Sequence, residues 1–359
     1  MNDKNKSILI PLIAIFLGFL SGVIIMVITG QDPSVLFKSI IRAVTGINID
    51  RIGSSKGFFT PRMLGEYFVY AMPIILTGLS VAFAFRTGLF NIGAEGQVMV
   101  GAMVSAILGV LIDLPAILLL PIVVCGGTLA GAIWGYIAGF LKAKYNVHEV
   151  VVTIMLNYTA MYMSAMFLKM LPGSTSVKTV DIHSGGLLQS EFLKNLTSGS
   201  RLHFGFILVI LSIYLFNYII NKTNYGYELK AVGYNPFAAE YAGMKVKERA
   251  AQSMAIAGAF SGLAGVLLVS GTFGYGRVLL AFENYGFDGI AVALIGGNTA
   301  LGSLFGGLLL AALKAAQPLM GAKNVPDAIA VIISSMIIIF IAMRAGILDI
   351  LEKIKGGKK

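Results

Sequence analysis

Residues Asn221 to Arg249 read NKTNYGYELKAVGYNPFAAEYAGMKVKER, a polar and turn-rich stretch that lies between two apolar runs. The runs extend from Phe204 to Ile220 and from Ala250 to Val269. A helix needs roughly 17–25 apolar residues to cross a bilayer, so both runs are long enough. The stretch between them is either a solvated connector or an element that docks a soluble partner, and periodicity leaves both open.

A short helix is predicted inside this stretch. Asn235-Pro236 starts a turn and can cap a helix, because proline suits the first helical position. We expect the helix over Phe237 to Tyr241, with Gly243 ending it at C′. Basic residues follow it: Lys245, Lys247 and Arg249. The pattern predicts a rigid knob at a membrane surface.

The composition is that of a membrane protein. Of 359 residues, 57% are hydrophobic and 12% are charged, and the mean hydropathy is +0.84. Soluble domains carry about 25% charged residues. We therefore expect an all-α protein that crosses the lipid bilayer many times. The net charge of +10 comes from basic residues in short loops between apolar runs, which favours membrane topology over nucleic-acid binding.

Cysteine and histidine indicate no metal or disulfide chemistry. The single cysteine, Cys125, lies in an apolar run, which excludes a disulfide framework and a thiolate metal site. His148, His183 and His203 are not at ligand spacing, and we expect them to be solvated or interfacial. The sequence therefore predicts no metal site.

About ten apolar runs are predicted to form spans. They lie at residues 8–28, 66–84, 91–110, 115–140, 150–168, 204–220, 250–269, 288–295, 301–318 and 325–343. The whole chain, 1–359, is expected to be a single transmembrane domain, with long polar loops at 31–65 and 169–203 and a basic tail at 344–359. A surface-lying helix in the first loop is predicted by apolar residues on one helical face: Val35, Leu36, Ile40, Ala43, Val44 and Ile47.

Loop charges predict the orientation. An even number of spans places both termini on one side of the membrane. Most lysines and arginines of short loops lie on that side, whereas the short loops of the other face hold only Arg277 and Lys323. By the positive-inside rule, both termini, the tail and the 221–249 loop are expected in the cytoplasm. The loops at 31–65 and 169–203 are then extracytoplasmic.

Glycines recur at a spacing typical of packed membrane helices. The fourth run carries a glycine at every fourth position, and three other runs carry one such pair each: Gly127, Gly131, Gly135 and Gly139; Gly18 and Gly22; Gly258 and Gly262; Gly302 and Gly306. Small residues at this spacing let two backbones approach closely. The pattern predicts packing within the chain, and an interface with a second subunit is an alternative for one such face.

Polar residues interrupt the apolar part near residues 86–91. Asn91 is expected to cap a helix, with Glu95 in its first turn, where the helix dipole favours negative charge. Gln97 follows in the same turn region. The segment is either a helix start at the membrane interface or a half-helix that begins inside the membrane beside a translocation path.

A second interruption falls at the corresponding place in the other half of the chain. After Asp288, the residues Gly296-Gly297-Asn298-Thr299 break an apolar run, and such backbone is tolerated at membrane depth only when it is buried in protein or lines a cavity. Polar residues also line one face of the fifth span, at Glu149, Thr153 and Asn157. They either make interhelical contacts or line the path.

Several catalytic and nucleotide-binding motifs are absent. The sequence contains no GxxxxGK[ST], HExxH or GxSxG pattern and no chain of intramembrane carboxylates. We therefore expect neither an enzyme nor a proton pump. Amides and hydroxyls predominate at the two breaks, which favours a neutral, hydrogen-bonding solute over an ion.

The chain resembles the membrane permeases of ABC importers in the branched-chain amino acid, ribose and nucleoside group, and is most similar to the nucleoside subgroup. Four stretches carry the resemblance: TGLFNIGAEGQVMVGA (87–102), HEVVVTIMLNYTA (148–160), YGYELKAVGYNPFAAEYAGMKVKERAAQSMAIAGAFSGLAGVL (225–267) and FDGIAVALIGGNTALGSLFGGLL (287–309). The similarity extends from Phe58 to Met343.

The resemblance implies a set of partners in the bacterial cytoplasmic membrane. The chain would be one of two membrane subunits that are similar but not identical. Two cytoplasmic ATP-binding domains would dock on the coupling loops, and an extracytoplasmic binding protein, often a lipoprotein, would deliver the solute. The permease itself would bind no cofactor, because the ATPase partner uses the ATP.

The resemblance also assigns regions of the chain. The residues that match the ATPase-coupling region are Glu228, Asn235, Pro236, Ala239, Glu240, Tyr241 and Gly243. The candidates for the solute path are Asn91, Glu95, Gln97, Asn157, Asn298 and Thr299. Nucleosides are the expected cargo, with simple sugars or branched-chain amino acids as alternative cargo. An ion-coupled secondary transporter is the alternative to an ABC importer.

Overall fold

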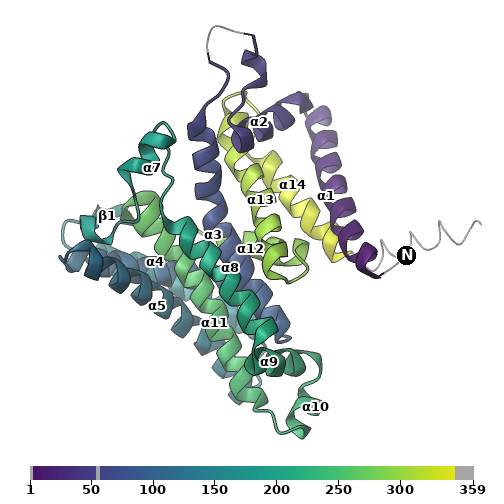
Figure 1. Cartoon of the computed structure of the whole chain (residues 1–359), viewed down its shortest axis with the longest axis vertical. Coiled ribbons are helices and arrows are strands. Elements are labelled where there is room, and N and C mark those ends of the chain that lie inside the picture. Colours follow the sequence, from purple (N-terminus) through teal and green to yellow (C-terminus); the bar gives the residue numbers. More distant parts are fainter. Residues whose placement is uncertain (1–2, 54–56, 344–359) are drawn as a thin grey trace, which may run out of the picture. The chain divides into compact units, whose positions relative to one another are not determined.

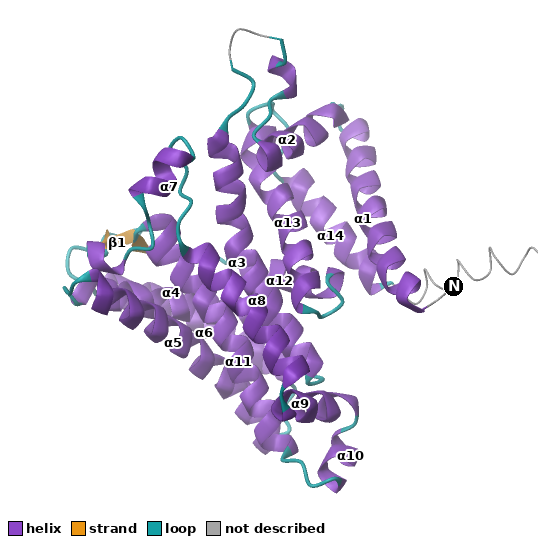
Figure 2. Ribbon diagram, viewed as in Figure 1, coloured by secondary structure: helices purple, strands orange, loops and turns teal. Residues whose placement is uncertain are grey.

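The structure is a computed structural model that describes residues 3–53 and 57–343, so the expected basic tail at 344–359 lies outside the described residues. The chain folds as two compact units, Met1–Tyr67 with Leu309–Lys359, and Phe68–Leu308. The described parts are helical apart from one small pair of strands (Figures 1 and 2). The predicted all-α fold is therefore confirmed.

Long helices occupy the predicted apolar runs. Their bounds are α1 (Asp3–Ile28), α3 (Pro61–Arg86), α4 (Ala94–Leu111), α5 (Ala116–Tyr145), α6 (Glu149–Lys169), α8 (Gly205–Lys222), α11 (Val246–Val266) and α13 (Ala300–Gly321). A π-helix, η3 (Leu267–Phe273), prolongs α11. Within the described residues, these eight are long and apolar enough to cross a membrane. The two remaining predicted spans are shorter helices, α12 (Tyr285–Ile295) and α14 (Ala328–Ala342), of 11 and 15 residues.

The predicted glycine pattern packs helices of the same chain against one another. In the larger unit a Cβ on Gly131 of α5 would lie 2.5 Å from the Gly258 carbonyl oxygen and 2.5 Å from the Gly262 Cα, both in α11. In the smaller unit the side chain of Ile337 in α14 fills the space beside Gly18 of α1. These glycines therefore serve packing within the chain.

The 169–203 loop is more structured than its polar sequence indicated. It contains β1 (Lys178–Asp181), η2 (Ser184–Gly186) and α7 (Glu191–Leu196). Strand β1 pairs antiparallel with β2 (Tyr275–Arg277), with Lys178 opposite Arg277. The loop is thus hydrogen-bonded to the chain segment that follows η3.

The smaller unit contains a helix where the sequence predicted a surface-lying one. This is α2 (Pro33–Thr45), which Asp32 caps by accepting a hydrogen bond from the Ser34 amide, and the turn η1 (Ile49–Arg51) follows it. As expected from the apolar face, Leu36 and Ala43 are buried. Helix α2 turns away from the end of α1 (Figure 1). The rings of Phe19 and Phe37 stack between the two helices.

Candidate functional site

The first helix break joins α3 to α4 through a pair of buried amides. The Asn91 Nδ2 donates to Gln97 Oε1 at 2.9 Å, and the Gln97 Nε2 donates to Asn91 Oδ1 at 3.0 Å. Asn91 Nδ2 also contacts Ser80 Oγ at 3.0 Å. The expected N-cap role of Asn91 is therefore wrong: Gly93 occupies the cap position and no side chain caps α4 there. The amide of Asn91 is already fully used by Gln97 and Ser80.

Asn157 of α6 supplies the contact that a cap would make. Its Oδ1 accepts from the Gly96 amide at 2.8 Å, and its Nδ2 donates to the Ile92 carbonyl at 3.0 Å. The neighbouring Thr153 is buried and donates to the Glu149 carbonyl at 2.8 Å. Both ends of the Asn157 amide are occupied, so this residue positions the start of α4.

Glu95 links the start of α4 to the start of α12. Its Oε1 accepts from the amides of Glu283 and Asn284, both at 2.9 Å, and its Oε2 accepts from the Gly286 amide at 2.6 Å. Glu95 is 1% exposed, so these three donors replace the hydration of its carboxyl group. A carboxylate is well placed there because free amides and the helix dipole at a helix start favour negative charge.

The second break is a tight turn between α12 and α13. Gly297 and Asn298 both have positive φ angles, 57° and 56°, and the Thr299 Oγ1 accepts from the Gly302 amide at 3.0 Å. The Arg86 Nε, at the end of α3, donates to the Asn298 carbonyl at 2.8 Å. The two breaks that the sequence placed in corresponding positions therefore touch.

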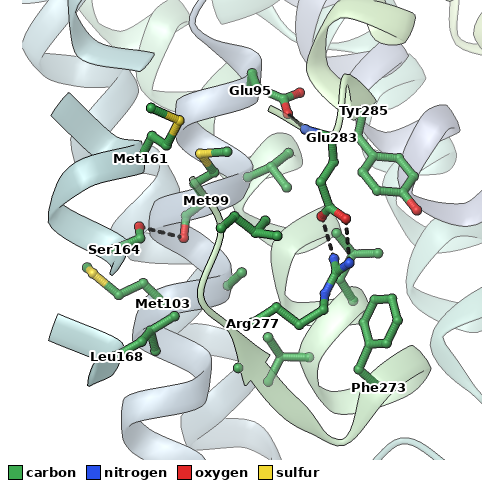
Figure 3. A pocket seen from close by; sticks show the side chains of 16 residues that line it. Glu95, Met99, Met103, Met161, Ser164, Leu168, Phe273, Arg277, Glu283 and Tyr285 are labelled. Carbon is green, nitrogen blue, oxygen red and sulfur yellow. Dashed lines mark hydrogen bonds and ion pairs between the residues drawn. The ribbon is translucent and has the colours of Figure 1, made fainter. Parts of the chain in front are cut away.

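A narrow cavity lies beside Glu95 (Figure 3). Methionines from α4 and α6 form its apolar wall: Met99, Met103 and Met161. Its polar edge consists of Glu95, Ser164, Arg277, Glu283 and Tyr285. The free space at its centre is about 30 Å³, enough for one or two water molecules. Of the six predicted path residues, Glu95 alone lines this cavity.

Arg277 and Glu283 close one side of the cavity. The guanidinium makes a two-pronged ion pair with the Glu283 carboxylate, and its carbon lies 3.7 Å from the centre of the Phe273 ring (Figure 3). This ion pair was not predicted from the sequence. The two residues are six apart in an irregular loop, so no helical or strand periodicity relates them. The only signal in the sequence was that this loop is rich in glycine and aromatic residues.

The predicted knob has the expected short helix, α10 (Pro236–Tyr241), preceded by an unexpected one, α9 (Asn224–Tyr234). The Asn235 Oδ1 accepts from the Phe237 and Ala238 amides, both at 3.1 Å. Gly243 has a φ of 82°, which ends the helix as predicted. An ion pair of 2.6 Å between Glu228 and Arg249 fastens α9 to α11.

Aromatic side chains cover the outside of the knob. Tyr234, Phe237 and Tyr241 are 94%, 82% and 97% exposed. Glu240 is exposed beside them, whereas Ala239 is buried and serves packing. Of these rings the coupling prediction included only Tyr241. The spacing of Phe237 and Tyr241, four residues apart on a helix in a polar loop, was the signal for a shared face.

His203, for which the sequence indicated a solvated or an interfacial position, is not solvated. It is fully buried, its Nδ1 accepts from the Gly205 amide at 3.1 Å, and its ring fills the space beside Gly271 of η3. Burial lowers the pKa of His203 to about 4, so the ring is neutral at physiological pH. The ring thus packs against η3, and other residues of η3 line the cavity.

Among the described residues, no three His, Cys, Asp or Glu side chains form a group that could hold a metal.

Comparison with known proteins gives a consistent result over the full length. A family profile described as branched-chain amino acid transport system, permease component, matches residues 63–342. The guanosine ABC transporter permease protein NupP of Bacillus subtilis is 42% identical over 356 residues, 99% of this chain and 99% of its own.

Two further relatives are of the same general kind. The nucleoside ABC transporter permease protein NupB of Lactococcus lactis is 38% identical over 100% of this chain and 97% of its own. The glucose ABC transporter permease protein TsgB13 of Haloferax volcanii is 30% identical over 83% of this chain and 82% of its own. No solved structure matches the chain.

Proposed function

This chain belongs to the family of branched-chain amino acid transport permease components, and from that premise we propose that it is the membrane-spanning subunit of a bacterial ABC importer for nucleosides. The observation that supports nucleosides as the cargo is the full-length similarity, at 42% and 38% identity, to permeases named for guanosine and nucleosides. The subunit is not an enzyme: a partner chain hydrolyses the ATP. It is a multi-pass protein of the bacterial membrane.

We propose that the cavity beside Glu95 is part of the solute path. Its combination of methionine side chains with a few converging polar groups suits a molecule that has both a flat apolar face and hydrogen-bonding edges, as a nucleoside has. At about 30 Å³ the cavity holds water but no nucleoside, so the wall formed by η3, β2 and the start of α12 must move away from α4 and α6 during transport. Of the other five candidate path residues, Asn91, Gln97 and Asn157 support the start of α4, and Asn298 and Thr299 form the second break.

A chain of contacts connects the knob to both breaks. A Cβ on Gly233 of α9 would lie 2.5 Å from the Arg86 carbonyl oxygen, so α9 packs directly on the end of α3. Arg86 in turn holds the Asn298 carbonyl of the second break. We propose that an ATP-binding subunit grips the knob from the cytoplasm, and that its movement reaches the path through these contacts.

The proposed orientation places both termini and the knob in the cytoplasm, and the 31–65 and 169–203 loops outside. It rests on the loop charges and on an even number of spans: eight helices are long enough to span, and α12 and α14 together raise the number to ten and keep it even. An extracytoplasmic binding protein would deliver the solute to the outer face. A second, non-identical permease subunit would complete the membrane part of the complex.

The exposed rings of the knob provide a direct test of coupling. We expect Phe237→Ser to weaken association with the ATPase subunit about tenfold or more, because exposed aromatic side chains at the centre of an interface carry much of its binding energy. Gly243→Pro is expected to have a similar effect, because proline cannot adopt a φ of 82° and lacks the amide that donates to Glu240. Charge reversal at Glu240 tests the same surface.

The measurement is co-purification of the ATPase subunit, together with ATP-driven uptake. Phe192→Ser is the matched control, because Phe192 is 69% exposed on α7, in the other long loop. It should leave ATPase association unchanged. If the Phe237 and Gly243 variants bind the ATPase and transport like the wild type, the docking role of the knob is wrong.

Cargo is tested by uptake of radiolabelled guanosine in cells that contain or lack the ATPase subunit. We expect uptake only with the ATPase, and we expect competition by unlabelled nucleosides but not by glucose. Competition by glucose alone would transfer the function to sugars, the cargo of the Haloferax volcanii relative. Uptake without the ATPase would exclude an ABC importer and favour an ion-coupled transporter.

A further inference from the structure

A polar cavity in the smaller unit is unrelated to the solute path. It lies among α2, the turn around η1 and the end of α13, and its volume is about 280 Å³. Three cationic side chains line it: Lys38, Arg42 and Lys323. Two carboxylates, Asp32 and Asp50, also line it, so the cavity retains one uncompensated positive charge.

The two carboxylates are already engaged. Asp50 pairs with Lys38 at 2.8 Å and with Lys323 at 3.6 Å. Asp32 accepts from the amide and the hydroxyl of Ser34, at 2.8 and 2.6 Å. Both acids therefore stay ionised, and the hydrogen bonds from these neighbours hold the pKa of each below its usual value.

Arg42 has no such partner among the residues that the structure describes. Its Nε is buried, and no atom in the described part of the chain accepts a hydrogen bond from it. A buried, unpaired guanidinium donor is costly, and the planar group is shaped to bind a carboxylate or a phosphate with two parallel hydrogen bonds. An anion in this cavity would accept the hydrogen bond of Arg42 and balance its charge.

The position of the cavity favours an anion that bears phosphate. Lys323 follows the end of α13 at Gly321, and Lys38 and Arg42 lie on α2, the next helix after α1, which ends at Ile28. This is the level at which lipid headgroups meet a membrane protein. Helix α2 also exposes Phe37 and Ile41, 47% and 40%, as an amphipathic helix does when it lies against acyl chains.

We propose that Lys38, Arg42 and Lys323 bind a phosphate-bearing anion in this cavity, carried by a phospholipid headgroup or present as free phosphate. The guanidinium of Arg42 makes the central contact, and the two lysines, already fixed by Asp50, add charge. The bound phosphate holds α2 against the end of α13. The proposal is independent of the cargo and of the ATPase.

The test measures thermal unfolding of the purified full-length protein in detergent, titrated separately with phosphatidylglycerol and with inorganic phosphate. We expect a saturable rise in the unfolding midpoint for the wild type. Arg42→Gln should weaken the apparent affinity about tenfold or more, because it removes a charge-assisted hydrogen bond to phosphate. Lys323→Gln, at a side chain that is 58% exposed, should fold normally and show a smaller loss.

The control is Lys194→Gln, which removes one positive charge from an equally exposed lysine in the 169–203 loop. It should bind like the wild type. A rise with phosphatidylglycerol alone assigns the site to lipid, and a rise with inorganic phosphate alone assigns it to free phosphate; both support the site if Arg42→Gln weakens them. The proposal is overturned if neither ligand raises the midpoint, or if Arg42→Gln and Lys323→Gln respond like the wild type.

Discussion

Gly131→Leu is expected to prevent the larger unit from folding. Even the first carbon of the new side chain would lie 2.5 Å from the Gly258 carbonyl oxygen and from the Gly262 Cα, and neither backbone atom can rotate away. Ordinary overpacking of a core costs about 1–3 kcal/mol. Two helices forced apart along their contact should cost more, and we expect the yield of detergent-extracted protein to fall at least several-fold.

The matched control for this prediction lies on the same helix. A Cβ on Gly126 would meet only the end of the flexible Leu108 side chain, which can move. Gly126→Ala should therefore be extracted normally, whereas Gly131→Ala should already lower the yield. Equal yields of these two alanine variants, or a wild-type yield of Gly131→Leu, would show that α5 and α11 do not meet through Gly131.

Spans were predictable because apolar composition alone decides which segments enter a bilayer. The ends of the helices were less predictable, because a helix can extend beyond its apolar run into charged residues that lie in water. Helix α11 begins at Val246 rather than near Ala250, because Lys247, Glu248 and Arg249 form its first turn. The knob helix α10 was predictable from a local signal, a proline after an asparagine and a glycine at the end.

Helix α9 was missed because two glycines made its sequence resemble a loop. In the structure these glycines are contact points. A Cβ on Gly226 would lie 2.0 Å from the Ile219 carbonyl oxygen, and one on Gly233 would collide with the end of α3. Which partner a glycine faces depends on the tertiary fold, so a single sequence cannot distinguish such a glycine from a flexible one.

The contacts of the candidate path residues were predictable only in part for the same reason. Polar residues near the breaks were singled out because they are costly in an apolar setting, and the structure buries Asn91, Glu95, Gln97 and Asn157. Their partners were not predictable: Asn91 pairs with Gln97, and Asn157 holds the start of α4. Arg277 lines the cavity at the end of β2, which pairs with β1 from a distant part of the chain, and Glu283 reaches the same cavity from the loop after β2.

Substitution of Glu95 by alanine is expected to cause a second large loss of stability. In Glu95→Ala three amides lose their acceptor: the buried amide of Gly286 and the part-buried amides of Glu283 and Asn284. An unsatisfied buried donor costs about 1–3 kcal/mol and a part-buried one less, so we expect a loss of roughly 3–5 kcal/mol, a large share of the stability of many domains. Thermal unfolding of the purified protein and its extraction yield measure this directly.

Glu95→Gln separates geometry from charge. The carbonyl of glutamine can still accept from the Glu283 and Asn284 amides, but its NH₂ group would face the Gly286 amide, donor against donor. We expect an intermediate loss of about 2–3 kcal/mol. A variant as stable as the wild type would mean that the Gly286 contact contributes nothing.

Because Glu95→Gln is expected to lose stability, its uptake must be interpreted with care when an ABC importer is compared with a proton-coupled transporter. If Glu95 were the proton site of a secondary transporter, Glu95→Gln would keep its fold and lose uptake. The geometry at the start of α12 predicts that uptake falls because the fold weakens, so loss of uptake alone cannot distinguish the two mechanisms. The distinguishing measurement is the residual uptake of Glu95→Gln at low temperature, where the folded fraction is high. In an ABC importer this residual uptake still requires the ATPase subunit and is unaffected by collapse of the proton gradient.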